Sequence, residues 1–525
     1  MEEVFGTVEE LMAMEAPVSA PYEHLYRARE LLKASVPGTT QEQLTTLALL
    51  GKICVLVEEP HVAQPYLEKA LQVLPECNSL LSYAQAAIGN VESVVNALPK
   101  IYVPGNVNVN VADVVDVLQQ LGMLWVERSL PLKALCFLTA AEDIGRDERD
   151  VHTHTLFYLA QVYTQLNQSK IAAGYCQQTL QRQLESNQTL PSDWSKNCLG
   201  LSAFYIASNQ LHHAMECVFA CKDFAQDEDT VARVAIVEAK VLFELLRSPC
   251  QPTEKILFPS LKLPSIQDAM WPYSITSYDH ARDIFKRAMS ALDLAKNVFV
   301  LDGYVTDHIR ILQLQSQAYT RLIEYEQDRK RQIAMLNRRL GFLTPLLFED
   351  NGNDSITLNR NAFGYLVQEL LFEAADVYGV LHDLKCSNMT SSYATTNHYA
   401  LDGIRCLERF LKLYFFQQGT DSRSELDVVL PSPLTRPTQL EKDEDSKPFV
   451  TGVFYLARLY GKLNFTQVEK TVAAWSKSLQ LHENILHLVP PNANFFKDER
   501  AISVEMTQLL PEKINRLHFQ NKHLG

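Results

Sequence analysis

Two histidines two residues apart, His152 and His154, form the first arrangement in this sequence that could bind a metal ion. On a strand they would share one face, but the flanking pattern is helical and directs them to different faces. Cys217 and Cys221 lie four residues apart on a predicted helix, and no His or Cys pair at zinc-site spacing accompanies them. We therefore interpret these side chains as surface or groove histidines and buried, reduced thiols, and predict no metal and no cofactor.

Motifs that mark common active sites are absent from the sequence. It contains no GxGxxG or GxxxxGK[ST] phosphate loop, no HExxH and no GxSxG. The adjacent His212 and His213 have the same simple interpretation as the first pair, and the basic run DRKRQ with Arg338 and Arg339 is typical of a solvated helix face. We therefore predict that the chain is not an enzyme and has no small-molecule substrate.

Composition and charge bound the class of protein. Lys and Arg number 48 against 62 Asp and Glu, a net charge of −14 that argues against nucleic-acid binding, because phosphate groups need dense Lys and Arg. The longest apolar stretch is interrupted by Lys52 and is too short for a membrane span, so we expect no membrane insertion. The acidic N-terminus lacks a secretory signal pattern. We predict a cytoplasmic protein and expect a monomer.

Internal repeats determine the predicted fold. The tetratricopeptide (TPR) pattern places W-x₂-L-G-x₂-Y on the first helix of a hairpin and A-x₃-F on the second, so that small residues mark where the two backbones approach most closely. Its first-helix positions are matched by Leu47, Leu50, Gly51 and Cys54; by Leu118, Leu121, Gly122 and Trp125; by Leu156, Leu159, Ala160 and Tyr163; and, more weakly, by Cys198, Leu201, Ser202 and Tyr205. The sequence therefore predicts an all-α fold, a curved α-solenoid of TPR-like helix hairpins.

The repeats also predict how the chain is divided. Residues 1–248 are predicted to form an N-terminal TPR-like half. Its repeats lie near 44–77, 115–148, 153–186 and 195–228. Prolines are concentrated in residues 249–275, which we interpret as a linker because proline breaks helices.

The remaining residues, 276–525, predict long helices and a C-terminal half of degenerate TPR-like pairs. One long helix is expected over about 304–340. The segment 419–447 is polar, contains several prolines and the acidic run DED, and is expected to be a disordered loop.

A binding surface is expected on the inner wall of the solenoid, where the first helices of successive hairpins line up. Residues outside the packing positions should face this wall, and their apolar bodies and hydrogen-bonding ends suit a protein interface. The candidates are Phe157, Tyr158, Gln161 and Gln165 in the third repeat and Gln119, Gln120, Met123 and Glu127 in the second. The alternative is that Tyr158 and Met123 only cover neighbouring helices.

Two stretches resemble the kinesin-binding protein family (KIF-binding protein). They are THTLFYLAQVYTQLNQSKIAAGYCQQTLQRQLE and FVLDGYVTDHIRILQLQSQAYTRLIEYEQDRKRQIAMLNRRL. The LDGYVTDHI block is the more diagnostic, since it is not a TPR consensus. FYLARLYGKL and VEMTQLLPEKINRLH fit the same family in the same order.

The resemblance implies a solenoid of two TPR-like halves that binds kinesin motor domains and regulates microtubule attachment, transport and axon development. It implies association with the cytoskeleton, and it places motor contacts on the FYLAQ block, here Tyr158 and Gln161. We hypothesise that an acidic inner face competes with the microtubule for the basic surface of the motor. The alternative function is a TPR co-chaperone or assembly scaffold that binds peptide C-termini.

Overall fold

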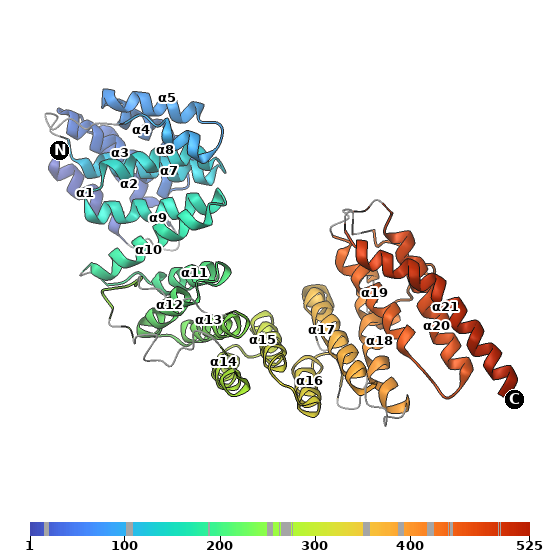
Figure 1. The fold of residues 1–525 in the computed structure, drawn as a ribbon. Helices are drawn as coiled ribbons and strands as arrows, with labels where there is room; N and C mark the ends of the chain where they lie inside the picture. The colour runs from blue at the N-terminus through green and yellow to red at the C-terminus, as the bar shows by residue number, and fades with distance from the viewer. Residues whose placement is uncertain are drawn as a thin grey trace. The chain divides into compact units, whose positions relative to one another are not determined.

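Every element longer than three residues in the described part of the chain is an α-helix (Figure 1). The computed structural model describes residues 1–14, 20–100, 109–186, 189–248, 256–261, 263, 275, 277–349, 358–386, 393–416, 425–438, 440, 445–491, 493 and 495–524. Successive helices pack as antiparallel pairs, which confirms the predicted all-α solenoid of TPR-like hairpins. The helices fall into two units, Met1–Ala225 with Gln251–Trp271, and Gln226–Cys250 with Pro272–Gly525.

The first unit contains the helices of the four predicted repeats, preceded by one further pair. Its elements are α1 (Glu2–Ala13), α2 (Glu23–Ala34), α3 (Thr40–Leu56), α4 (Pro60–Gln72), the 3₁₀ turn η1 (Pro75–Cys77), α5 (Asn78–Ala86), α6 (Val91–Asn96), α7 (Val111–Glu127), α8 (Pro131–Ile144), α9 (Arg149–Gln165), α10 (Ser169–Glu185), α11 (Trp194–Ala207) and α12 (Leu211–Phe224). The repeat hairpins are α3 with α4, α7 with α8, α9 with α10, and α11 with α12.

All four repeat hairpins turn in the same way. Each turn has three residues, and the middle one has a positive φ: 60° at Glu58, 59° at Ser129, 56° at Asn167 and 55° at Asn209. The amide of the following residue then donates to a carbonyl in the last turn of the first helix, at 2.8–2.9 Å. This pattern is the left-handed cap that ends many helices, and it reverses the chain within three residues.

Small residues let the two helices of a hairpin touch. A Cβ atom added to Gly51 of α3 would lie 2.4 Å from Leu67 Cδ2 of α4, and one added to Gly122 of α7 would lie 2.7 Å from Leu138 Cγ of α8. Both distances are below van der Waals contact, so the leucine of the second helix occupies the space that a side chain would need. The small position of the repeat is therefore a packing requirement.

The boundary between the units lies earlier than the residue 248 predicted from the repeats. Helix α13 (Glu228–Arg247) packs against α14 (Tyr278–Val298), so it belongs with the second unit. Most of the predicted linker 249–275 lies outside the described residues. Within it, Leu257 is held in the first unit, because its carbonyl accepts from Gln177 Nε2 at 2.7 Å and its amide donates to Glu216 Oε2 at 3.2 Å.

The second unit continues with pairs of longer helices. They are α15 (Val305–Ile323), α16 (Arg329–Leu343), α17 (Arg360–Cys386), α18 (Tyr393–Phe415), the 3₁₀ turn η2 (Glu425–Asp427), α19 (Lys447–Lys462), α20 (Val468–Leu488) and α21 (Lys497–Leu524). The single helix expected over 304–340 is therefore wrong. Helix α15 ends at Ile323, and α16 starts after Asp328, whose carboxylate accepts from the Lys330 amide at 2.8 Å and caps the new helix.

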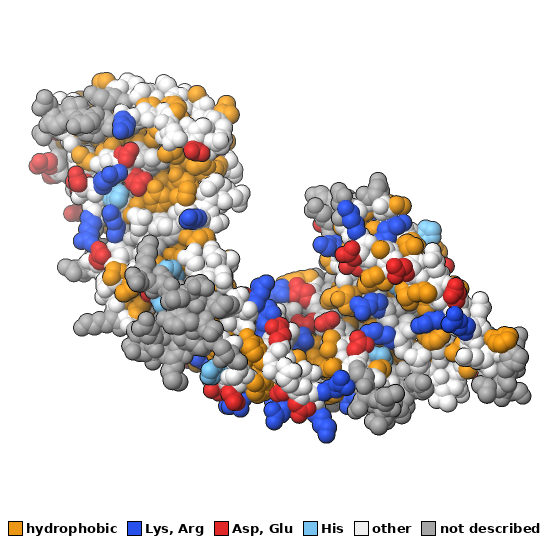
Figure 2. Space-filling model, in the orientation of Figure 1, with side chains coloured by type: hydrophobic (Ala, Val, Ile, Leu, Met, Phe, Trp, Pro, Cys, Tyr) orange, Lys and Arg blue, Asp and Glu red, His pale blue; other side chains and the backbone are white. Residues whose placement is uncertain are grey.

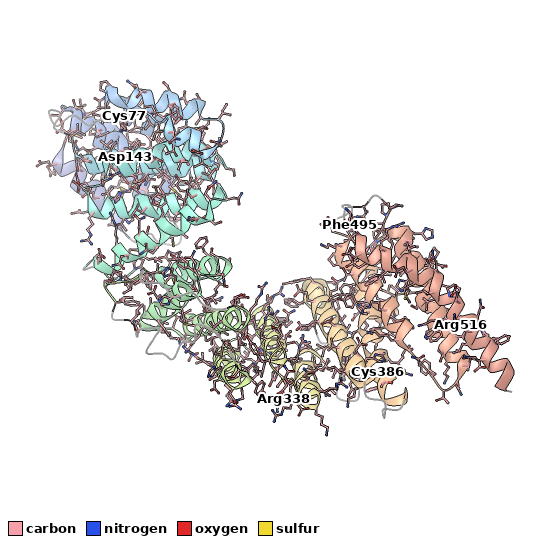
Figure 3. The ribbon with its side chains drawn as sticks, viewed as in Figure 1. Cys77, Asp143, Arg338, Cys386, Phe495 and Arg516 are labelled. Atoms are coloured by element: carbon pink, nitrogen blue, oxygen red, sulfur yellow. The ribbon has the colours of Figure 1, made fainter. Side chains whose placement is uncertain are left out.

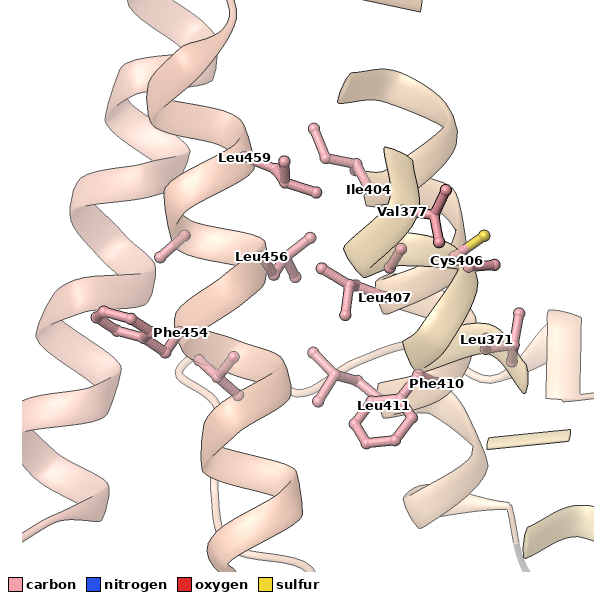
Figure 4. Close-up of a cluster of buried hydrophobic side chains, with 14 of the residues drawn as sticks. Leu371, Val377, Ile404, Cys406, Leu407, Phe410, Leu411, Phe454, Leu456 and Leu459 are labelled. Atoms are coloured by element: carbon pink, nitrogen blue, oxygen red, sulfur yellow. The ribbon is translucent and has the colours of Figure 1, made fainter. Parts of the chain in front are cut away.

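Interlocked apolar side chains of α17, α18 and α19 form part of the core of this unit (Figure 4). Leu456 and Leu459 of α19 point toward Ile404, Leu407 and Leu411 of α18. The same small-residue contact recurs here, since a Cβ on Gly452 would lie 2.5 Å from Phe410 Cε1. Among the described residues, no helix combines the length and apolarity needed to cross a bilayer.

Part of the expected disordered loop 419–447 is instead attached to the core. The Glu425 carboxylate is completely buried and accepts from Arg360 Nε at 2.9 Å and from an Arg409 guanidinium nitrogen at 3.0 Å. Burial alone would raise the pKa of Glu425, but the two guanidinium groups lower that pKa below its ordinary value. Polar composition predicted disorder here because it cannot reveal that one carboxylate meets two buried arginines.

We predict that Gly122→Val lowers the free energy of unfolding of the first unit by about 1–3 kcal/mol, because the new side chain displaces Leu138. The control is Gly174→Val, the same substitution at a helical glycine whose added Cβ meets nothing within 4 Å. Thermal denaturation followed by circular dichroism measures both. Equal melting temperatures for the two variants would contradict the packing requirement.

The second unit should also lose stability in acid. His482 of α20 is buried, its Nδ1 lies 3.1 Å from Ser503 Oγ of α21, and burial lowers its pKa to about 4. A histidine in the unfolded chain titrates near pH 6.5, so below that pH the folded state binds fewer protons than the unfolded state. The contribution of this histidine to the free energy of unfolding is therefore fully present above pH 6.5 and is lost as the pH falls toward 4.

This histidine accounts for a loss of about 2 kcal/mol between pH 7 and pH 5. Chemical denaturation at the two pH values should therefore show a smaller pH dependence in His482→Gln than in the parent protein. His487→Gln, at an exposed histidine of the same helix, is the control and should retain the parent dependence.

Candidate partner-binding surface of the N-terminal unit

The first helices of three repeats, α3, α7 and α9, lie beside one another, as the predicted inner wall requires. Polar contacts join α3 to α7. Asp113 Oδ2 accepts from Gln41 Nε2 at 2.6 Å and from Thr45 Oγ1 at 2.8 Å, and Asp116 lies 3.5 Å from Lys52 Nζ. These two carboxylates are already engaged within the unit. Of the two, only Asp116 faces a cation, and the acidic inner face stays a prediction.

Gln119 does not face a partner, which corrects the prediction from the repeat register. Its side chain is only 4% exposed, and its Nε2 donates to the Val151 carbonyl at 2.8 Å and to Thr155 Oγ1 at 2.7 Å. Because α9 packs directly beside α7, this position is occupied by a contact between the two helices. Gln119 therefore joins adjacent repeats.

Tyr158 lies between the core and the surface. It is half-buried against the apolar cluster of Leu135, Leu138 and Leu159, and its ring centroid lies 5.7 Å from that of Phe157. Burial raises its pKa, and the Asp116 charge raises it further. Replacing Tyr158 would thus disturb packing as well as any partner contact.

A groove opens where α9 and α11 separate. These two helices do not pack closely, and the space between them is a cavity of about 690 Å³. Phe157 and Gln161 of α9 line one wall, and small residues of α10, including Ala172, Ala173 and Cys176, form the floor. The predicted residues Phe157 and Gln161 therefore lie together in a groove that is mainly apolar with polar edges.

The opposite wall was not predicted. It is formed by Lys196, Asn197 and Phe204 of α11. The repeat match of α11 is weak, with Cys198 and Ser202 at positions that usually carry a large and a small apolar residue, so this wall could be located only by extending the register of the third repeat.

The other candidate residues lie outside this groove. Gln165 and Glu127 are exposed near the ends of α9 and α7, and Gln120 and Met123 are half-buried on α7. Figure 2 shows apolar side chains on the part of the surface over α7 and α9 that is in view. These four residues extend the candidate surface away from the groove.

The side chains considered first for chemistry have structural partners. His152 is buried against Arg182, and His213 Nδ1 lies 3.1 Å from Glu216 Oε2, whereas His154 is exposed. Cys198 Sγ contacts the Cys217 carbonyl at 3.6 Å, and burial raises the pKa of Cys198 well above its ordinary value. Within the described ranges, no three His, Cys, Asp or Glu side chains are grouped so that they could hold a metal ion.

The basic run on α16 is only partly a solvated face. Arg338, labelled in Figure 3, is exposed, as the sequence predicted. Arg339 is buried, and its guanidinium donates to Ser316 Oγ at 3.1 Å and lies 3.4 Å from Glu373 Oε1. Adjacent residues of a helix point in directions about 100° apart, which explains the difference.

A family model and several relatives from one protein family together match residues in both units of this chain. A family model described as "KIF-1 binding protein C terminal" matches residues 243–517, just over half of the chain. The KIF-binding protein of Danio rerio is 27% identical over 505 residues, which cover 78% of this chain and 76% of its own. That of Xenopus tropicalis is 28% identical over 444 residues, 73% of this chain and 69% of its own.

One solved structure also aligns with the chain. It is titled "Circular tandem repeat protein with novel repeat topology and enhanced subunit contact surfaces" and covers 100% of this chain and 91% of its own, at 10% identity. The TM-score of 0.19 is too low for the alignment to inform the fold.

We predict that Gln119→Ala lowers the free energy of unfolding of the first unit by about 1–2 kcal/mol, because it removes two buried hydrogen bonds between α7 and α9. Gln161→Ala, the same substitution at an exposed position of the groove, should change stability by less than about 0.5 kcal/mol. Urea denaturation compares the two. A larger loss for Gln161→Ala would reverse the assigned roles.

Proposed function

Because the chain belongs to the KIF-1 binding protein family, we propose that it is a non-catalytic protein that binds kinesin motor domains through the groove between α9, α10 and α11. We assign the binding site to this groove because Phe157 and Gln161, both predicted from the repeat pattern, lie on one wall of a cavity of about 690 Å³. The relatives named KIF-binding protein support the kind of partner.

The groove suits the surface of a folded protein. Phe157 and Phe204 provide aromatic area on opposite walls, and the small floor residues leave space for a bulky side chain of the partner. Gln161, Asn197 and Lys196 provide hydrogen-bond donors at the edges. Apolar anchors surrounded by polar groups are typical of the centre of a protein interface.

We propose that the protein regulates a kinesin by keeping its motor domain from the microtubule. A motor held in this groove has part of its surface covered, so its attachment to the microtubule changes when the covered part is the filament-binding surface. Within the groove, the aromatic side chains of Phe157 and Phe204 and the polar side chains at the edges carry the binding through apolar contact and hydrogen bonds. We extend the proposal to a cytoplasmic monomer, associated with the cytoskeleton, that regulates transport and axonal microtubules in neuronal development.

We predict that Phe157→Ala combined with Gln161→Ala weakens binding to an isolated kinesin motor domain at least tenfold, because it removes the aromatic anchor and a polar edge of the groove. Fluorescence anisotropy with a panel of purified motor domains measures the dissociation constants. Microtubule co-sedimentation of the motor, with the protein in excess, then tests whether its attachment changes.

The matched control is Ile171→Ala combined with Gln178→Ala. These exposed residues lie on the side of α10 that faces away from the groove, and they repeat the loss of one apolar side chain and one glutamine. The control should bind like the parent protein. Equal binding of the motor domain by both double variants would contradict the proposed binding site. Binding of short peptide C-termini, without binding of any motor domain, would favour the co-chaperone alternative.

A further inference from the structure

A second and larger groove lies in the C-terminal unit. It has a volume of about 1070 Å³ and crosses the helices α13, α15, α17, α18 and α19. Most of these helices are the first members of their pairs, so the groove follows the wall that corresponds to the inner wall of the repeats. The proposed motor site in the first unit does not use any of its residues.

Aromatic side chains form the floor of this groove. Tyr365 is 50% exposed. The ring centroids of Phe372 and Phe410 lie 5.5 Å apart, and those of Phe410 and Tyr414 lie 5.4 Å apart. The contacts between these rings and the buried position of Phe410 hold the floor in place. A half-exposed tyrosine in the same groove as these fixed aromatic rings can receive one apolar side chain of a ligand.

Side-chain amides lie along the same groove. Gln317 of α15 is exposed, Gln368 of α17 is half-buried, and neither side chain forms a hydrogen bond with the described residues. An amide side chain both donates and accepts, so it can pair with the N–H and C=O groups of an extended backbone. The groove therefore has the groups needed to bind a peptide main chain.

The charges of the groove are arranged around its centre. In the middle, Arg310 donates to Glu369 at 3.1 Å, and the two charges balance. Lys240 on α13 and Lys447 on α19 are exposed at opposite ends, and neither has an ion-pair partner among the described residues. In a chain with a net charge of −14, this groove thus has a local excess of positive charge.

We propose that this groove binds an extended acidic segment of another protein. Carboxylates near the two ends of the segment pair with Lys240 and Lys447, an apolar side chain between them packs on Tyr365 and Phe372, and the backbone bonds to Gln317 and Gln368. Along the first helices of the pairs, the three steps from α13 through α15 and α17 to α19 span roughly 30 Å. An extended segment that reaches from α13 to α19 is therefore about nine residues long.

The test uses a fluorescein-labelled peptide of sequence EEFSLGSEE and the full-length protein, with binding measured by anisotropy at low salt. Saturable binding that weakens as salt is added is expected, since exposed charges are screened. The double variant Lys240→Glu and Lys447→Glu should bind at least tenfold more weakly. Arg329→Glu with Lys330→Glu reverses the same number of charges on an exposed part of α16 and should bind like the parent protein.

Three results would overturn the proposal: no saturable binding of the acidic peptide, equal binding by the two charge-reversed variants, or equal binding of the peptide KKFSLGSKK. Circular dichroism shows that each variant is folded. The acidic peptide is also tested with Phe157→Ala and Gln161→Ala combined, which should leave its binding unchanged. Loss of peptide binding in that variant would mean that the peptide binds in the first groove, and this too would overturn the proposal.

Discussion

The structure depends on the close approach of two helices in each hairpin, where a residue with little or no side chain faces a large one. Gly51 meets Leu67 and Gly122 meets Leu138, each at a distance that leaves no room for another side chain. Because this contact fixes the separation and the register of the two helices, it also fixes which residues face outward. The left-handed turns at Glu58, Ser129, Asn167 and Asn209 maintain the same geometry from repeat to repeat.

The way in which hairpins stack then decides which outward residues are available to a partner. Where α7 and α9 lie side by side, the outward Gln119 is used to join them. Where α9 and α11 separate, the corresponding part of α9 borders open space, and Phe157 and Gln161 line a groove. The same repeat position can therefore be structural in one hairpin and available for binding in the next.

Charge acts locally in this chain. In a chain with a net charge of −14, Asp116 on α7 lies beside Lys52 of α3, and Glu425 is buried between two arginines that attach its segment to the second unit. The larger groove even has an excess of lysine at its ends. Net charge describes the average surface, whereas a binding site depends on the few charges that lack an internal partner.

The sequence by itself determined the class of fold, the four hairpins of the first unit and two residues of the groove, because the TPR pattern repeats with local spacings of three and four residues along each helix. It could not place α13 with α14, separate α15 from α16, attach Glu425 to its arginines or find the wall formed by Lys196, Asn197 and Phe204. These features depend on which helices become neighbours in space and how far apart they stand. Only the tertiary structure decides this, because packing between hairpins brings together residues that no local pattern relates.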